Sequence, residues 1–200
     1  AVSRHPKNVP LRLASARVSL QAEDYSRAMS YFQVAKRNGA DARMAETGLA
    51  LAQLYGRRKL GAEKSLERAL EATDEEGNAL DASPEVQVWE LIVKARLALL
   101  DEKRGLAVRY GKQAAAIRPD DADLALLQAD IEEDRERSPE EPLRRAVVAK
   151  VPMPVAAGRL GVLLGPTDEG CDLVASYLRA NRSGKQARKA RAVRGQCAAE

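Results

Sequence analysis

The sequence predicts an all-α protein, on the evidence of its composition and of a repeating pattern of small residues. Aromatic residues make up only 4% of the 200 residues, whereas 45% are hydrophobic, chiefly alanine, leucine and valine. Alanine favours helices and lets their backbones approach, while β-sheets are enriched in β-branched and aromatic residues. The chain is long enough for one sizeable domain or two small ones.

The repeating pattern is the stronger of the two signals. The first copy comprises Ala16, Ala28, Phe32 and Ala35. The second copy stands 34 residues later and comprises Ala50, Ala62, Leu66 and Ala69. The third copy follows after 11 additional residues and comprises Ala95, Ala107, Gly111 and Ala114. A fourth copy begins on time at Ala129 and is expected to break off, because Pro139 and Pro142 fall where its second helix would run.

This spacing resembles the tetratricopeptide repeat (TPR), a 34-residue helix–turn–helix unit. The resemblance rests on the small residue of each first helix, the alanine that opens each second helix, the bulky residue four positions later, and Pro119 at the end of the third copy. It covers about residues 9–137 and lacks most of the Trp, Gly and Tyr that the family favours in its first helix. It implies a right-handed superhelix of antiparallel helix pairs, and the 34-residue period disfavours a rival helical-pair repeat.

The helix pairs of the predicted repeat domain, residues 1–149, follow in order. The first two pairs occupy about residues 9–42 and 43–76, with turns before Tyr25 and near Lys59. The polar segment 73–83 is expected to be a solvated loop. Ser83 and Pro84 then cap the first helix of the third pair, residues 88–121. A partial repeat, residues 122–149, completes the domain.

The C-terminal third has a different composition. Residues 150–166 are expected to form a linker, since Pro152 and Pro154 disfavour helix before them. The sequence leaves open whether residues 155–165 form a short helix or extended chain. Residues 167–200 are expected to form a basic C-terminal helical pair, in which Ala175 and Ala187 stand as far apart as Ala16 and Ala28.

A groove for a partner is implied by the resemblance, because the family places the first helix of each pair on its concave face. The residues expected there are Leu13, Arg17, Thr47, Leu51, Tyr55, Trp89, Ile92 and Arg96. An apolar strip with two arginines and two aromatic rings suits a peptide segment or a partner helix. The Lys and Asn residues with which some members grip a C-terminal carboxylate are missing, which excludes that ligand. The alternative is that these residues only pack between helices.

Basic residues gather at the C-terminal end, where residues 173–199 contain seven cations and no acid. They are Arg179, Arg182, Lys185, Arg188, Lys189, Arg191 and Arg194. Residues 120–141 hold ten acids, so pairing between the two segments, within one molecule or between two, is the favoured explanation. An acidic protein partner comes next. Nucleic acid or an anionic membrane surface is less favoured, since only Tyr177 could stack on a base.

The two cysteines, Cys171 and Cys197, flank the predicted C-terminal helical pair. Antiparallel helices would bring these ends together, so a disulfide is expected, and with it an oxidising compartment such as a bacterial periplasm or cell envelope. The alternative is two free thiols in a cytoplasmic protein. The Arg- and Ala-rich composition points to a bacterial source. The chain opens at Ala1 rather than Met, which leaves its targeting undefined.

Catalytic and cofactor-binding motifs are not found in the sequence. A single His and two Cys argue against a zinc site and a His-dependent catalytic centre. Neither Gly111-Lys112 nor Gly184-Lys185 has the spacing of a phosphate-binding loop. No segment has the length and apolarity of a membrane span. We therefore expect no enzyme, metal or cofactor, but a protein–protein interaction scaffold that serves as an assembly subunit of a larger bacterial complex. The alternative is a nucleic-acid or anionic-surface binding module that uses the basic tail.

Overall fold

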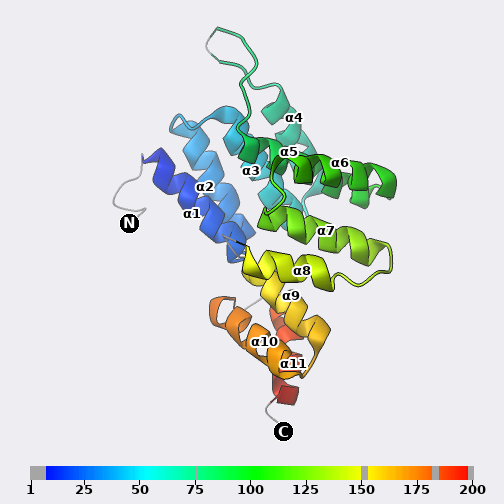
Figure 1. Ribbon diagram of the computed structural model, residues 1–200. Coiled ribbons are helices and arrows are strands. Elements are labelled where there is room, and N and C mark those ends of the chain that lie inside the picture. Colours follow the sequence, from blue (N-terminus) through cyan, green and yellow to red (C-terminus); the bar gives the residue numbers. More distant parts are fainter. Residues whose placement is uncertain (1–7, 75, 150–152, 182–184, 198–200) are drawn as a thin grey trace. The chain divides into compact units, whose positions relative to one another are not determined.

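The computed structural model describes residues 8–74, 76–149, 153–181 and 185–197, and all regular elements in this part of the chain are helices (Figure 1). Their bounds are α1 (Val9–Gln21), α2 (Tyr25–Arg37), α3 (Ala42–Tyr55), α4 (Lys59–Leu70), α5 (Pro84–Leu100), α6 (Arg104–Ile117), α7 (Ala122–Asp134), α8 (Glu140–Val148), α9 (Pro154–Leu164), α10 (Asp168–Ala180) and α11 (Lys185–Cys197). The prediction of an all-α fold is confirmed.

Side-chain caps fix where most of the first helices of the pairs begin. Asn8, Asp41, Ser83 and Asp121 each accept a hydrogen bond from a backbone N–H of the first turn of α1, α3, α5 and α7. Each cap satisfies a donor that has no partner within the helix and contributes about 1 kcal/mol. The loop before α5 lies in the expected segment, where Thr73 and Ala79 form an isolated antiparallel bridge.

One turn geometry closes the first helix of all four pairs. Glu23, Arg57, Glu102 and Glu136 have left-handed φ values of 58°, 61°, 59° and 58°, although none is glycine. At the first turn, the N–H of Glu23 donates to the carbonyl of Leu20, and the next N–H donates to that of Ser19; the other three turns repeat this pattern. This is the Schellman arrangement that satisfies the last carbonyls of a helix. The four turns therefore share one register.

The described helices form two compact units, residues 1–119 and residues 120–200, and each is considered by itself. We call them unit 1 and unit 2. Unit 1 contains α1 to α6, which are the three complete pairs that the repeats predict. The boundary falls between the third and fourth pairs, whereas the sequence analysis placed the end of the repeat domain near residue 149.

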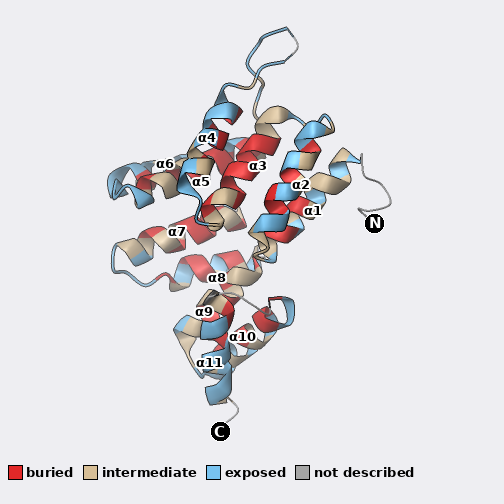
Figure 2. Ribbon diagram, turned by 180° about the vertical axis from the view of Figure 1, so that it is seen from behind, coloured by how far each residue is buried: buried red, intermediate tan, exposed pale blue. Residues whose placement is uncertain are grey.

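Unit 1 has α3 at its centre, packed against α2, α4 and α5, and the buried colour covers most of this helix in Figure 2. The repeated alanines have no exposed surface, as Ala16, Ala50 and Ala95 show. Phe32 of α2 lies on Gly48 of α3, where a Cβ atom would stand 2.3 Å from the ring. Small residues therefore allow the close helix contacts that the repeat pattern predicts.

Two buried glutamates tie neighbouring pairs of unit 1 together. Glu46 of α3 accepts hydrogen bonds from Lys36 of α2 (2.6 Å) and Arg68 of α4 (3.2 Å). Glu90 of α5 pairs with Arg43 of α3 at 2.7 and 3.0 Å. The hydrogen bond from Glu90, followed by its charge, raises the pKa of Arg43 against the opposing effect of burial. Each carboxylate therefore has the partners that a buried charge requires.

Unit 2 corrects the expectation that the fourth repeat breaks off. Helix α8 begins at Glu140 and packs against α7, so the fourth pair is complete though short. Pro142 is the third residue of α8, where a backbone N–H would have no partner within the helix. Pro139 precedes the helix and caps it. The two prolines therefore shift the start of the second helix and do not prevent it.

Helix α9 corrects the expectation of a linker over residues 150–166. Pro154 stands at its start, where proline is favoured, and Gly165 ends it with a φ of 68°. Gly158 faces the ring of Tyr177, and a Cβ atom on Gly161 would lie 2.8 Å from Val174 of α10. These glycines allow α10 to approach, so α9 pairs with α10, and α11 packs against both. The expected C-terminal pair is thus the second and third helices of a three-helix group.

Candidate protein-binding surface

Burial divides the predicted groove residues of unit 1 into two sets. Thr47, Leu51 and Ile92 have no exposed surface, and Trp89 is 5% exposed. These four side chains pack between helices and cannot contact a partner while the helices keep their positions. Leu13, Arg17, Tyr55 and Arg96 are half-buried, so each keeps a face accessible to solvent. We call these four residues the arginine–aromatic surface.

Arg17 connects the first pair of helices to the third. Its guanidinium lies over the ring of Trp89, 5.3 Å from the ring centroid, and its Nη2 atom donates to Glu85 at 2.8 Å. Trp89 in turn meets Phe32 edge to face, with centroids 6.4 Å apart. The ring and the carboxylate hold the guanidinium in one orientation, which lowers the entropy that a ligand must remove on binding.

Arg96 has a similar seat on a pair of tyrosines. Its guanidinium lies 4.7 Å from the centroid of Tyr55, and Tyr55 stacks on Tyr25 with centroids 5.6 Å apart. Burial is the main reason why the pKa of Tyr25 is raised above its ordinary value; the charge of Glu23 adds to the effect, and Arg96 opposes it. Tyr25 therefore stays neutral at physiological pH and supports Tyr55 as a rigid platform.

The arginine–aromatic surface thus presents two oriented cations on α1 and α5, with apolar side chains beside them. Guanidinium groups bind carboxylates by paired, charge-assisted hydrogen bonds, and the Arg17–Glu85 pair is an example within the chain itself. Sequence reasoning identified both arginines and both rings. It missed Glu85 and Tyr25, because their roles depend on contacts between pairs that no spacing reveals.

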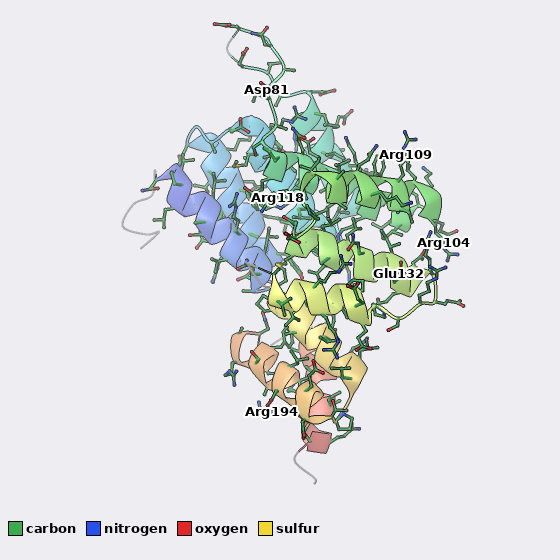
Figure 3. All side chains as sticks on the ribbon, in the orientation of Figure 1. Asp81, Arg104, Arg109, Arg118, Glu132 and Arg194 are labelled. Carbon is green, nitrogen blue, oxygen red and sulfur yellow. A yellow bond between two sulfur atoms is a disulfide. The ribbon has the colours of Figure 1, made fainter. Side chains whose placement is uncertain are left out.

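The predicted basic patch lies on α10 and α11 of unit 2. Its described members, Arg179, Arg188, Lys189, Arg191 and Arg194, are exposed, and Figure 3 labels Arg194 on α11. Ala187 and Ala190 are fully buried on the other side of α11. Helix α11 therefore has a narrow packed side and a broad basic side. Arg182 and the side chain of Lys185 lie outside the described residues.

Carboxylates of the acidic segment 120–141 find cationic partners close at hand. Asp130 and Glu133 of α7 pair with Arg159 of α9 at 2.7 and 2.9 Å. Burial lowers the pKa of Arg159, but the charges and hydrogen bonds of these two carboxylates outweigh it, so the pKa is raised. Glu140 and Glu141 pair with arginines of α8. These pairs join helices of unit 2 without using the basic patch.

Cys171 of α10 and Cys197 at the end of α11 form a disulfide, with Cα atoms 5.9 Å apart. The bond closes a loop over a sequence separation of 26 residues, which contributes about 3 kcal/mol in the chain-entropy account. It supplements a small apolar contact, in which Ala187 and Ala190 meet Val174, Tyr177 and Leu178. The disulfide therefore contributes much of what holds α11 in place.

Other kinds of site find little support in the described part of the chain. Its His, Cys, Asp and Glu side chains form no group of three that could hold a metal ion. None of its helices combines the length and the apolarity needed to cross a membrane.

Comparison with known proteins yields a match in structure only. No protein-family profile and no curated protein matches the sequence. A tetratricopeptide repeat protein from Parabacteroides merdae aligns over 98% of this chain and 73% of its own, with 13% identity and a TM-score of 0.54. YrrB, a TPR protein whose structure is described as having an unusual peptide-binding site, aligns over 96% of this chain and 95% of its own, with 13% identity and a TM-score of only 0.41. The helix pairs, their common turn and the first of these likenesses agree, and the chain has a tetratricopeptide-repeat-like fold.

Proposed function

We propose that this protein is a non-enzymatic scaffold that binds a segment of another protein on the arginine–aromatic surface of unit 1. The observation that carries the proposal is the seating of Arg17 on Trp89 and of Arg96 on Tyr55. Arginines held by aromatic rings are frequent in the regions that dominate protein interfaces. A TPR-like fold supports the same conclusion, because stacked helix pairs offer extended surfaces for binding.

The partner segment is expected to be extended or helical and to carry carboxylates. A carboxylate could replace Glu85 at Arg17, or bind Arg96 beside Tyr55, and its apolar residues would pack against Leu13. Exposed ion pairs alone contribute little affinity. The aromatic supports therefore matter as much as the two charges.

The test compares capture of partners by three forms of the chain from extract of the cells that make it. The wild type is set against Arg17→Ala with Arg96→Ala, and against Arg37→Ala with Arg109→Ala, which removes two exposed arginines elsewhere in unit 1. A partner identified by mass spectrometry is then titrated by calorimetry. We expect about a tenfold or greater loss of affinity for the first variant only. Equal binding by all three forms would reject the arginine–aromatic surface.

A role as an assembly subunit in a bacterial cell envelope is a further part of the proposal. The Cys171–Cys197 disulfide supports it, because such bonds persist in oxidising compartments. Trapping the thiols of intact cells with a mass-shifting alkylating reagent tests this. An oxidised pair supports an envelope or periplasmic location, whereas two alkylated cysteines support the cytoplasm.

A second candidate function rests on the exposed basic side of α11, which carries no acidic residue. It would bind nucleic acid or an anionic surface. Binding to a DNA oligonucleotide would then weaken steeply with salt, since each neutralised phosphate releases counterions. Reversal of Arg188 and Arg191 to Glu would abolish it, whereas reversal of Arg17 and Arg96 would not.

Self-association between residues 120–141 and 179–194 is the remaining proposal for the charged segments. It predicts a dimer at low ionic strength that dissociates as salt screens the attraction. Sedimentation at two salt concentrations distinguishes it, and a monomer at both would exclude it.

A further inference from the structure

The outward face of α1 lacks a cover that the corresponding face of α3 has. Residues of the two helices correspond at an interval of 34, as Ala16 and Ala50 show. On α3, Ala45 and Ala52 are 1% and 0% exposed. On α1, the corresponding residues are Leu11, which is half-buried, and Val18, which is 62% exposed. Ala14, which corresponds to the buried Gly48, is also exposed. The difference arises because α2 packs on α3, whereas α1 stands at the free edge of unit 1 (Figure 1).

The contact between α2 and α3 shows what such a face accepts. Phe32 of α2 fills the space above Gly48, and four residues later Lys36 donates to the buried carboxylate of Glu46. The covering helix thus offers a bulky apolar residue followed, one turn on, by a charge opposite to that of the helix beneath. These two contacts fix its position along α3 and its direction.

Two substitutions between α3 and α1 alter the requirement. Ala14 replaces Gly48, so the space above α1 is shallower and suits a leucine better than a phenylalanine. Arg12 replaces Glu46 and reverses the charge; it remains half-buried beside Tyr31, with its guanidinium 5.7 Å from the ring centroid. The sequence of α1 contains Arg12 and Arg17 and no acid.

We propose that the face of α1 formed by Leu11, Arg12, Ala14 and Val18 is a docking site for an amphipathic helix of another protein. That helix carries a medium-sized apolar residue, followed four positions later by Asp or Glu. It packs on α1 as α2 packs on α3 and continues the stack by one helix. A second copy of α1 is a poorer occupant, because packing two such helices about Ala14 places arginines of both chains in the interface without a carboxylate.

This docking site is separate from the arginine–aromatic surface. Arg17 and Arg96 play no part in it, and Val18 and Arg12 play no part in the proposed function. Failure of one proposal therefore leaves the other intact.

The test uses the full chain and two synthetic peptides derived from α2. Both span residues 24–38 and carry Phe32→Leu; the acidic probe also carries Lys36→Glu, and the basic probe retains Lys36. Peptides of this length are only partly helical in water, so weak binding is expected. It is followed by the methyl NMR signals of Leu11 and Val18, which report the site directly.

We expect the acidic probe to shift these two signals and to bind about threefold more tightly than the basic probe, the effect of one partly exposed charge pair. Arg12→Glu should reverse the preference. Val18→Glu should abolish binding of the acidic probe, while Leu60→Glu, at a residue of α4 that is 65% exposed, should not.

Three results would overturn the proposal. They are equal affinity for the two probes, shifts that spare Leu11 and Val18, and loss of binding in Arg17→Ala with Arg96→Ala, which would place the peptide on the other surface. A dimer seen by sedimentation and dissociated by Val18→Glu would instead assign the face to a second copy.

Discussion

Phe32 of α2 lies so close to Gly48 of α3 that a Cβ atom at position 48 would stand 2.3 Å from its ring. We expect Gly48→Ala to destabilise unit 1 by about 1–3 kcal/mol, because the ring must leave its place between two helices. Urea unfolding followed by circular dichroism measures the change.

Gly105→Ala is the matched control, because nothing lies within 4 Å of the Cβ position in α6. It should be neutral or stabilising by up to about 1 kcal/mol, since alanine favours helix. Adding Phe32→Leu to Gly48→Ala should recover part of the loss. A loss that Phe32→Leu leaves unchanged would show that the ring is not the obstacle.

The left-handed turn residues predict a stabilising substitution. Glu102 has a φ of 59°, a conformation that costs a residue with a side chain about 1 kcal/mol. Glu102→Gly should remove that cost and raise the stability of unit 1 by about 0.5 kcal/mol. Glu71 also ends a helix but has a φ of −91°, so Glu71→Gly should lower the stability. Stability changes of the same sign at both positions would argue against the turn as the cause.

The buried pair of Arg43 and Glu90 predicts a strong dependence on charge balance. Arg43→Met leaves Glu90 without its cation and should cost about 3 kcal/mol or more. The double variant with Glu90→Leu removes both charges and should recover most of the loss. Thermal unfolding of the wild type, the two single variants and the double variant forms a mutant cycle. Additive losses would contradict a direct interaction.

Tyr25 predicts a loss of stability in alkaline solution. Burial, the first of its causes, raises the pKa of Tyr25 in the folded protein above the ordinary value of 10.0. Above pH 10 the unfolded chain releases the phenolic proton while the folded chain retains it, so the free energy of unfolding falls as the pH rises. Tyr25→Phe should remove this part of the pH dependence. An unaltered alkaline slope in that variant would locate its source elsewhere.

Reduction of the disulfide should act on unit 2 alone. We expect a phosphine reductant to destabilise α11 by about 3 kcal/mol, because the bond joins it to α10. Hydrogen exchange followed by mass spectrometry should show faster exchange in residues 185–197 and no change in α1 to α6. Cys171→Ala with Cys197→Ala should behave like the reduced chain and should not respond to the reductant. Full protection of α11 in either form would contradict a dominant role for the bond.

The alanine spacing was enough to predict the three helix pairs of unit 1, because close helix contacts require small residues at fixed positions. It was not enough at Pro142, since the effect of a proline depends on whether it stands in the first turn of a helix or in its interior. Gly158 and Gly161 suggested a linker, whereas they provide the room that Tyr177 and Val174 occupy in the structure. A glycine that permits packing and one that permits a bend look the same in a sequence.

The binding surface was predictable in part for a related reason. Periodicity placed Leu51 and Tyr55 on the same side of one helix, and it also placed Ile92 and Arg96 together. It could not show that Leu51 and Ile92 lie beneath their neighbours, because depth depends on how α1, α3 and α5 meet. Pairs such as Arg17 with Glu85, which are 68 residues apart, follow only from the folded structure.

The link between Arg17 and Glu85 also bears on how unit 1 folds. In a linear array in which each repeat touches only its neighbours, the repeats can melt one after another from an end. Here the first pair holds the third directly, so fraying of α1 also removes the cation that lies over Trp89. Unit 1 is therefore expected to unfold in a single concerted step, with its terminal pairs protected from fluctuations that would open the ends of an ordinary solenoid.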